Sequence, residues 1–358
     1  MCARRCLALW IFCVASTCSN PLPADDPTVP AQAIDFDSPT AADQPTPAPA
    51  PEKSPVQSQP GGAPAEAYEC PRLCRGIPRW TVTVDGLSLW RSGAEGPSPF
   101  RDQAGRQAPD LFRVNDLAFD PRPGFRFAAL YRTDLGWDLE LNYFQLDGWE
   151  AAGYVPGNVV LGAADTGFTV DDCTVRYRSE LYSGEVNLRR HRGDRLTLLA
   201  GLRFAELDDR LHVDSTGHVM PWPVTFEGRD INHLYGFQLG ADAALVRRGR
   251  LEVRGLVKAG VYDNHIDGTA AAADGPMRLA LGSETDHCAF LGEASLVGKF
   301  RLGEHLAVRG GYQVMWLDGV ALGPAQIGLS SDDGVTATIN TRNTLFLHGA
   351  IFGLEAAW

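Results

Sequence analysis

Three aspartates and a histidine lie close together in LDDRLHVDS, residues 207–215. Asp208, Asp209 and Asp214 offer carboxylates, and His212 offers an imidazole among them. Paired carboxylates beside a histidine can activate a water molecule for hydrolysis. Such a mechanism also needs a second acidic pair on a facing segment, and none is recognisable in this sequence. Because acidic loop residues are usually only solvated, we expect that the chain is not an enzyme and keep a surface hydrolase as an alternative.

Other residue patterns indicate neither a cofactor nor a metal site. Glycine-rich phosphate loops, zinc-ligand spacings and nucleophile elbows are absent from the sequence, so we expect no cofactor and no bound metal. Cys70 and Cys74 form a Cys-x-x-x-Cys pair without a nearby histidine, which favours a local disulfide. Cys173 and Cys288 lie at the ends of two long predicted loops. In an oxidising compartment we expect a disulfide between these two, with two free thiols as the alternative.

The net charge and the distribution of apolar residues restrict the class of protein. The 358 residues carry a formal charge of -12, which argues against electrostatic binding of nucleic acid. No apolar run reaches the roughly 18 residues that a transmembrane helix requires. A role within a membrane must therefore use β-strands.

The N-terminal segment has the composition of an export signal followed by a linker. Within residues 1–20, two arginines precede an apolar stretch and then a run of small residues, an order typical of a secretory signal peptide. Cys18 lies in a partial match to a bacterial lipoprotein box, so its lipidation stays open. Residues 21–78 are rich in proline and alanine and hold almost no large apolar side chain. Such a segment cannot bury enough surface to offset its ordering entropy, so we expect a disordered tether.

A structured region over residues 79–358 alternates apolar and polar residues with a period of two. In GWDLELNYFQLDG, Trp137 and Leu139 fall on one face while Asp138 and Glu140 fall on the other, a pattern that only a strand satisfies. Ten such segments occur, near residues 80–90, 125–133, 136–146, 179–191, 194–207, 232–247, 250–263, 289–301, 305–317 and 344–358. A count of twelve, with further strands at 224–230 or 334–340, is the alternative.

The predicted connections alternate between short and long. Four tight glycine turns, near residues 134–136, 192–194, 248–249 and 302–304, suit β-hairpins. The other links are long and cover residues 92–123, 148–178, 208–230, 266–288 and 318–343. All short turns then lie at one end of the sheet and all long loops at the other. This asymmetry is typical of an antiparallel up-and-down transmembrane β-barrel of a Gram-negative outer membrane.

The polar faces of the strands carry acids and bases in similar numbers. The inward set that we expect to form a lumen charge network is Asp138, Glu140, Glu185, Arg203, Asp242, Arg254, Lys258, Glu293, Lys299 and Arg309. In the core of a sandwich each unpaired ion would cost several kcal/mol of desolvation, whereas a barrel lumen can hydrate and pair these groups. A soluble, secreted β-sandwich that serves as a binding module produces the same alternation and stays an alternative.

The C-terminus has features of a barrel insertion signal. The last strand of an outer-membrane barrel resembles a pattern of polar, glycine and aromatic residues that the insertion machinery reads, and Gly353 and Trp358 match it. Ile351 and Ala356 depart from the pattern. A terminal aromatic residue is suited to anchor the closing strand at the membrane interface.

Three long segments carry a family resemblance. Residues Val114–Glu150, Ser179–Asp209 and His233–Asn264 resemble the planctomycete outer-membrane β-barrel family of unknown function. The resemblance implies a location in the cell outer membrane, contact with its lipid, and no catalytic residue.

The predicted size of the barrel sets the expected function. Ten strands enclose a narrow lumen, and bulky inward groups such as Arg203 and Lys258 largely close it. We therefore expect a structural or surface-interaction role, with long extracellular loops that contact an unknown ligand and at most a narrow pore for small solutes. Because some ten-stranded barrels are proteases with Asp and His at the loop rim, the hydrolase alternative would be omptin-like.

Overall fold

Long β-strands make up most of the described structure. The computed structural model describes residues 78–92, 100–101, 117, 119–157, 159–161, 168–215, 222–326 and 339–358. Its long strands are β1 (Trp80–Arg91), β3 (Arg122–Arg132), β4 (Asp138–Val155), β7 (Cys173–Arg192), β8 (Leu196–Ser215), β9 (Val224–Arg248), β10 (Leu251–Asp274), β11 (Met277–Arg301), β12 (Leu306–Val320) and β13 (Asn343–Ala357). The short elements are β2 (Phe100–Arg101), β5 (Val159–Leu161), β6 (Phe168–Val170) and the 3-10 helix η2 (Gly323–Gln326). No helix among the described residues is long and apolar enough to cross a bilayer.

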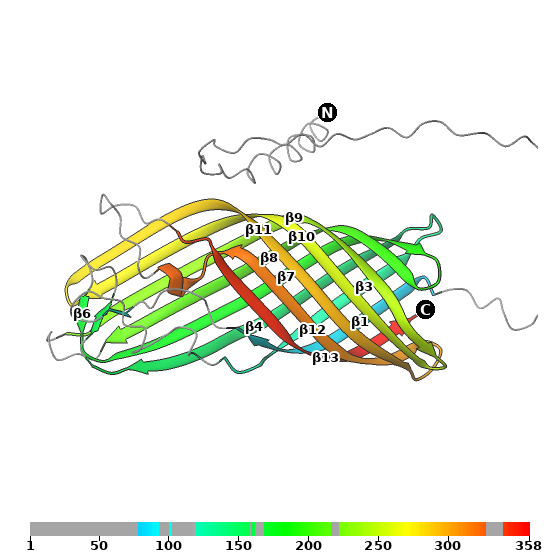
Figure 1. Cartoon of the computed structure of the whole chain (residues 1–358), viewed down its shortest axis with the longest axis horizontal. Coiled ribbons are helices and arrows are strands. Elements are labelled where there is room, and N and C mark those ends of the chain that lie inside the picture. The colour runs from blue at the N-terminus through cyan, green and yellow to red at the C-terminus, as the bar shows by residue number, and fades with distance from the viewer. Residues whose placement is uncertain are drawn as a thin grey trace, which may run out of the picture. The chain divides into compact units, whose positions relative to one another are not determined.

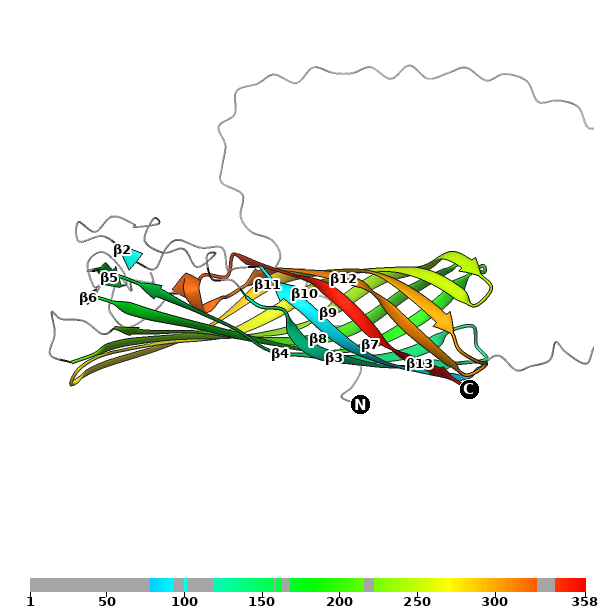
Figure 2. The ribbon, with the colours of Figure 1, turned by 90° about the horizontal axis from the view of Figure 1, so that it is seen from below.

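The long strands form one closed antiparallel barrel (Figures 1 and 2). They follow the order β1-β13-β12-β11-β10-β9-β8-β7-β4-β3, and β3 pairs with β1 to complete the ring. Every barrel strand therefore has two hydrogen-bonded neighbours, and the barrel has no open edge. The prediction of an all-β, ten-stranded barrel is confirmed. The β-sandwich alternative is wrong, because two packed sheets would not close on themselves. The strands β2, β5 and β6 form a separate small sheet.

Each predicted strand coincides with a barrel strand, but several strands are much longer than predicted. Residues 224–230 form the first part of β9 rather than an extra strand, and residues 334–338 lie outside the described part. Much of 148–178, 208–230 and 266–288 is strand rather than loop. Beyond the belt the apolar residues change from the outward to the inward face of the strand, so the alternation changes phase and does not extend the predicted strands.

Of the five long loops predicted for the far end of the barrel, the one over residues 266–288 is wrong. β10 and β11 meet there in a tight hairpin through Gly275 and Pro276. Gly275 has a φ of +56, in the left-handed region that favours glycine. At the opposite end, Gly136, Gly193 and Gly249 also have positive φ and form the expected short turns. We call this opposite end the short-turn end.

The first and last strands close the barrel through two tryptophans. The backbone N–H of Trp80 donates to the carbonyl of Trp358 at 2.9 Å, and the N–H of Trp358 donates back at 3.0 Å. Gly353 lies opposite Asp85 in this seam. A Cβ at Gly353 would lie 2.3 Å from the carbonyl oxygen of Val84, so the close approach of the two backbones requires glycine. The role of Gly353 and Trp358 as an insertion signal stays a prediction.

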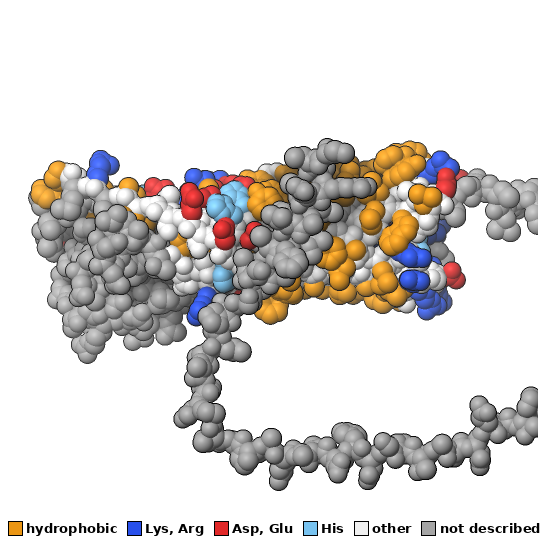
Figure 3. All heavy atoms as spheres, turned by 90° about the horizontal axis from the view of Figure 1, so that it is seen from above, with side chains coloured by type: hydrophobic (Ala, Val, Ile, Leu, Met, Phe, Trp, Pro, Cys, Tyr) orange, Lys and Arg blue, Asp and Glu red, His pale blue; other side chains and the backbone are white. Residues whose placement is uncertain are grey.

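Outward-facing side chains near the short-turn end form an apolar belt (Figure 3). Aromatic side chains lie at both limits of the belt. At the short-turn end they are Trp80, Tyr131, Trp137, Phe300 and Trp358, which cover only part of the circumference. At the other limit they form the far ring, which contains Trp90, Phe125, Tyr143, Phe204, Tyr235, Phe290, Trp316 and Phe346. On β8 the belt runs from Leu196 to Phe204, with Leu198 and Leu202 exposed between them. At a rise of about 3.3 Å per residue and a tilt of about 40°, this stretch spans about 20 Å, similar to the apolar band of outer-membrane barrels.

Beyond the far ring, part of the barrel continues as a projecting wall. This wall consists of residues 148–155 of β4, 173–180 of β7, 206–215 of β8, 224–233 of β9, 263–274 of β10 and 277–288 of β11. Its outward face carries charged residues and histidines, among them Glu150, Arg178, Asp208, Arg229, His233, Asp267 and Asp286. The change from apolar to charged side chains marks the upper limit of the belt.

Candidate functional site

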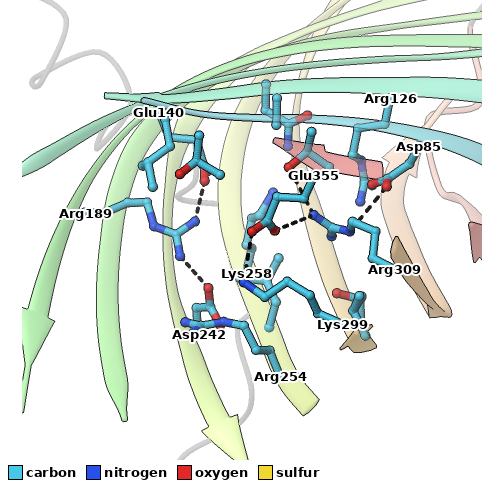
Figure 4. Close-up of a pocket in the computed structure, with 18 of the residues that line it drawn as sticks. Asp85, Arg126, Glu140, Arg189, Asp242, Arg254, Lys258, Lys299, Arg309 and Glu355 are labelled. Carbon is cyan, nitrogen blue, oxygen red and sulfur yellow. Dashed lines mark hydrogen bonds and ion pairs between the residues drawn. The ribbon is translucent and has the colours of Figure 1, made fainter. Parts of the chain in front are cut away.

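The inward faces of the strands form a charged layer near the short-turn end. A cavity of about 250 Å³ lies inside this layer and is lined by side chains from every barrel strand except β8 (Figure 4). Acids in the lining are Asp85, Glu140, Asp242 and Glu355; bases are Arg126, Arg132, Arg189, Arg254, Lys258, Lys299 and Arg309. Alternate residues on neighbouring strands point inward, which is why groups far apart in sequence meet here.

One arm of the charge network crosses β4, β7, β9 and β10. Arg189 lies between Glu140 and Asp242 and donates a hydrogen bond to each carboxylate. Arg254 donates from Nε to Asp242 at 2.9 Å and from Nη1 to Glu252 at 2.9 Å. These contacts form an unbroken chain of alternating charge along the barrel wall, and Figure 4 shows its part from Glu140 to Arg254.

A second cluster lies deeper and is almost completely buried. Lys258 Nζ lies 2.9 Å from Glu185 and 3.5 Å from Glu293. Arg203 Nη1 approaches the same two carboxylates, at 3.5 and 3.1 Å, and Arg126 Nη2 lies 3.3 Å from Glu293. The side chains of these five residues are at most 7% exposed. Burial of so many ions is tolerable because four of the five face at least two opposite charges, while Arg126 pairs with Glu293 and also donates to Gln313 at 2.6 Å.

The third arm joins the closing strands, and neutral amides link the parts. Lys299 Nζ lies 2.9 Å from Glu355, and Arg309 Nε lies 3.3 Å from Asp85. Asn187 donates from Nδ2 to Glu140 and Glu185, and so connects the first arm to the deep cluster. Sequence reasoning overlooked Asn187, although its position in the alternation of β7 placed it inward.

The structure brings nine of the ten predicted lumen residues into this connected network. They are Glu140, Glu185, Arg203, Asp242, Arg254, Lys258, Glu293, Lys299 and Arg309. Asp138 is inward as predicted but lies apart, nearer the short turns. It pairs with His191 at 2.9 Å and with Arg132 at 3.7 Å.

Above the charged layer the lumen is apolar rather than polar. The fully buried side chains there include Leu89, Phe144, Leu146, Leu181, Leu207, Leu234, Leu291, Leu317, Leu345 and Leu347. Arg126 and Arg203 lie over the ring of Phe144, 5.7 and 5.4 Å from its centroid, and so connect the two layers. These large side chains come from strands all around the barrel and belong to one buried hydrophobic cluster.

Residues 319–326, which we call the plug segment, fold against inward side chains beyond the apolar layer. Asn232 donates to the carbonyl of Ala321 at 2.8 Å, and its Oδ1 accepts from the N–H of Ala321 at 2.8 Å. Asn264 donates to the carbonyl of Gly319 at 3.1 Å, and Gly323 N–H donates to Asp209 at 2.9 Å. The buried amides satisfy backbone groups of the plug segment, which fixes it in place.

A buried ion pair braces the same region. Arg91 Nη2 lies 3.0 Å from Asp209 Oδ2, and both side chains are fully buried. Tyr177 donates its hydroxyl to the same oxygen at 3.0 Å. Both oxygens of Asp209 are therefore engaged, one by the ion pair and the tyrosine, the other by the plug segment.

The four residues of the hydrolase alternative do not form one site. Asp209 points into the barrel, whereas Asp208, His212 and Asp214 lie on the outer face of the projecting wall. Burial raises the pKa of Asp208, but hydrogen bonds from Arg210 and Arg229 outweigh it and lower that pKa to about 2. His212 pairs with Asp214 at 3.0 Å. A strand places adjacent residues on opposite faces, so the run of neighbouring acids is divided by the wall.

The expected disulfide between Cys173 and Cys288 is absent. Cys173 is buried inside the barrel at the start of β7, whereas Cys288 lies on the outward face of β11. Three strands separate β7 from β11 around the ring. At about 4.8 Å per strand spacing the two thiols are too far apart to bond. The signal peptide, Cys18, Cys70 and Cys74 lie outside the described residues and stay predictions.

Comparisons with known proteins show similarity to bacterial outer-membrane barrels. The outer membrane protease OmpT from Escherichia coli is 10% identical, with a TM-score of 0.41, and the match covers 78% of this chain and 96% of that one. The toluene transporter TodX from Pseudomonas putida is 11% identical over 78% and 91% of the two chains, with a TM-score of 0.34. An anion-selective porin from Comamonas acidovorans is 11% identical over 78% and 98%, with a TM-score of 0.22. Similarities this low do not indicate a shared function.

Neither a family nor a curated relative is identified by sequence. No family model matches the chain, and no curated protein matches it. The resemblance to the planctomycete barrel family therefore stays an expectation.

Proposed function

We propose that the chain is an outer-membrane β-barrel with a closed lumen, which anchors and presents the projecting wall and its loops outside the cell. The apolar belt supports the membrane location, because a water-soluble barrel would expose a continuous band of large apolar side chains to solvent. Aromatic side chains at both limits of the belt are typical of the two membrane interfaces. The short-turn end then faces the periplasm and the projecting wall faces outward.

The observation that carries this proposal is the occlusion of the lumen at three successive levels. Ion pairs fill the charged layer, buried leucines fill the next, and hydrogen bonds hold the plug segment beyond them. The cavity of about 250 Å³ belongs to the first level and is bounded above by the buried cluster around Glu293. It can hold water or a small ion, but it supports no continuous pore.

Conductance of the refolded, full-length chain in a planar bilayer tests the closed lumen. We expect no steady openings, because solute would have to displace the apolar layer. Frequent, sizeable openings of the wild-type protein would contradict the proposal. The double variant Asn232→Ala, Asn264→Ala loosens the plug segment without touching the apolar layer, so we expect it to stay closed as well. The location is tested separately by fractionation of the cell envelope and by the heat-modifiable migration typical of folded barrels.

The absence of enzymatic activity is part of the same proposal. It is supported by two observations. Asp208 and Asp209 lie on opposite faces of β8, and both carboxylates form ion pairs with arginines. A purified barrel that cleaves peptides or esters, and loses this activity in the variant His212→Ala, would contradict it.

A further inference from the structure

Two histidines and four acids lie side by side on the outer face of the projecting wall. Pairing across β8, β9, β10 and β11 places Glu206, His233, His265 and Asp286 in one row. Asp267 pairs with Glu284 in the next row outward. All these side chains share the outward face and lie just beyond the far aromatic ring. The cluster therefore lies outside the apolar belt, where water and ions have access to it.

The two histidines point toward the same carboxylate. His233 Nε2 lies 3.5 Å from Asp267 Oδ2, and His265 Nε2 lies 3.7 Å from Asp267 Oδ1. Ligand atoms of His265, Asp267 and Glu284 all lie within 4.8 Å of one another. Around a tetrahedral zinc ion with bonds of about 2.0–2.1 Å, neighbouring ligand atoms are about 3.3–3.4 Å apart. The distances of 3.5 and 3.7 Å between the histidines and Asp267 are close to this spacing, and Glu284 completes a group within 4.8 Å.

The far nitrogens of both imidazoles face further carboxylates. His265 Nδ1 lies 2.7 Å from Asp286 Oδ1, and His233 Nδ1 lies 3.3 Å from Glu206 Oε2. Metal-binding histidines commonly donate their second N–H to a carboxylate, which fixes the ring and leaves the other nitrogen available to the metal. This arrangement occurs at both histidines and is independent of the spacing around Asp267.

Charge in the cluster favours a cation. Three of the acids, Glu206, Asp267 and Asp286, form ion pairs with the two histidines. Within the described part of the chain, none of the three pairs with lysine or arginine. The four carboxylates of the cluster give this patch a negative potential that attracts a metal ion.

We propose that His265, Asp267 and Glu284, together with His233, bind a divalent transition metal of the zinc class. Imidazole nitrogens combined with carboxylate oxygens suit Zn²⁺, whereas Ca²⁺ and Mg²⁺ prefer oxygen ligands alone. The ligands come from β9, β10 and β11, so the bound ion cross-links three strands of the projecting wall. Glu206 and Asp286 orient the two imidazoles.

Calorimetric titration of the refolded, metal-free chain with Zn²⁺ tests the site. The experiment uses a Cys70→Ser, Cys74→Ser background, so that the N-terminal thiols do not bind the ion. We expect one equivalent to bind, with at least a tenfold loss of affinity in His265→Ala and in His233→Ala. Asp286→Asn, which alters only an orienting carboxylate, is expected to weaken binding about 10–100-fold. His212→Ala removes a histidine from the same outer face and is the matched control, with unchanged affinity.

Substitution with Co²⁺ identifies the ligands by a second readout. We expect visible absorption bands of a tetrahedral site built from nitrogen and oxygen, without the thiolate-to-metal band that Cys288 would produce. Each variant must first show the heat-modifiable migration of the wild-type barrel. If the folded wild-type chain binds no Zn²⁺, or if His265→Ala binds it as tightly as the wild type, the proposal is wrong and the cluster is only a set of ion pairs.

Discussion

Most buried ions in the charged layer contact more than one opposite charge. Lys258 is shared by Glu185 and Glu293, and Arg203 approaches both of these carboxylates. This sharing offsets the desolvation of five almost fully buried groups. Removal of a single member leaves an excess charge that water cannot reach, and this cost exceeds the energy of one ion pair.

The variant Lys258→Met tests this reasoning. Glu185 and Glu293 would then share fewer cations, so we expect the free energy of unfolding to fall by about 3–5 kcal/mol. Arg79→Ala removes the partner of Asp134 in an exposed pair and is the matched control; we expect a change of about 1 kcal/mol or less. Tryptophan fluorescence during denaturant unfolding in micelles measures both. Equal effects would show that the buried cluster adds no stability beyond that of a surface pair.

The two cysteines of the barrel are expected to differ in reactivity. Burial raises the pKa of Cys173 to about 12, and its thiol lies inside the barrel beyond the belt. Cys288 is only partly buried and faces outward. We expect a maleimide to modify Cys288 in the folded chain and Cys173 only after denaturation, as measured by mass mapping. Fast modification of Cys173 in the folded barrel would contradict its placement.

At the scale of elements, the closing seam depends on a glycine that has no room for a side chain. A Cβ at Gly353 would lie 2.3 Å from the Val84 carbonyl and 2.8 Å from the Asp85 Cα. We expect Gly353→Ala to separate β1 from β13 and to reduce the heat-modifiable, folded fraction. Gly86→Ala, in the same seam, places its Cβ 3.6 Å from the carbonyl oxygen of Phe352, an ordinary contact distance, and is the control with little effect. A folded fraction equal to that of the wild type in Gly353→Ala would contradict this account.

Alternation along the chain predicted the strands well only inside the belt. There, an apolar outward face and a charged inward face give the period of two, and residues such as Glu140 and Arg254 could be assigned to the lumen. Beyond Phe204 both faces of β8 change: leucines such as Leu207 fill the interior, and charged residues face water. The strand continues, but the pattern that reveals it is reversed.

Sequence patterns do not show which side chains from different strands come into contact. His233, His265 and Glu284 meet because β9, β10 and β11 pair in a fixed register, and nothing in their spacing along the chain shows it. The position of the plug segment could not be predicted for the same reason, because Asn232 and Asn264 donate hydrogen bonds to the backbone carbonyls of Ala321 and Gly319. Conversely, three aspartates and a histidine that are close in sequence, within residues 208–214, indicated a single site. The strand places Asp209 on its inward face and the other three on its outward face.

At the scale of the whole molecule, the outward faces of the belt and of the projecting wall contact different surroundings. Leu202 lies in the middle of the belt and is 63% exposed. Ala152 is exposed on the outward face of the projecting wall. If the belt lies in a bilayer, a charge at Leu202 must be moved into hydrocarbon, whereas a charge at Ala152 stays in water.

A pair of arginine substitutions therefore tests the membrane position of the barrel. For Leu202→Arg in phospholipid vesicles we expect the free energy of unfolding to fall by about 2–4 kcal/mol, the cost of arginine near the bilayer midplane. Ala152→Arg should leave it within about 0.5 kcal/mol of the wild type, because surface changes away from packed groups have small effects. Denaturant unfolding followed by tryptophan fluorescence measures both variants in the same vesicles. If both variants were equally stable, hydrocarbon would not surround Leu202, and the belt would have to face water or another protein.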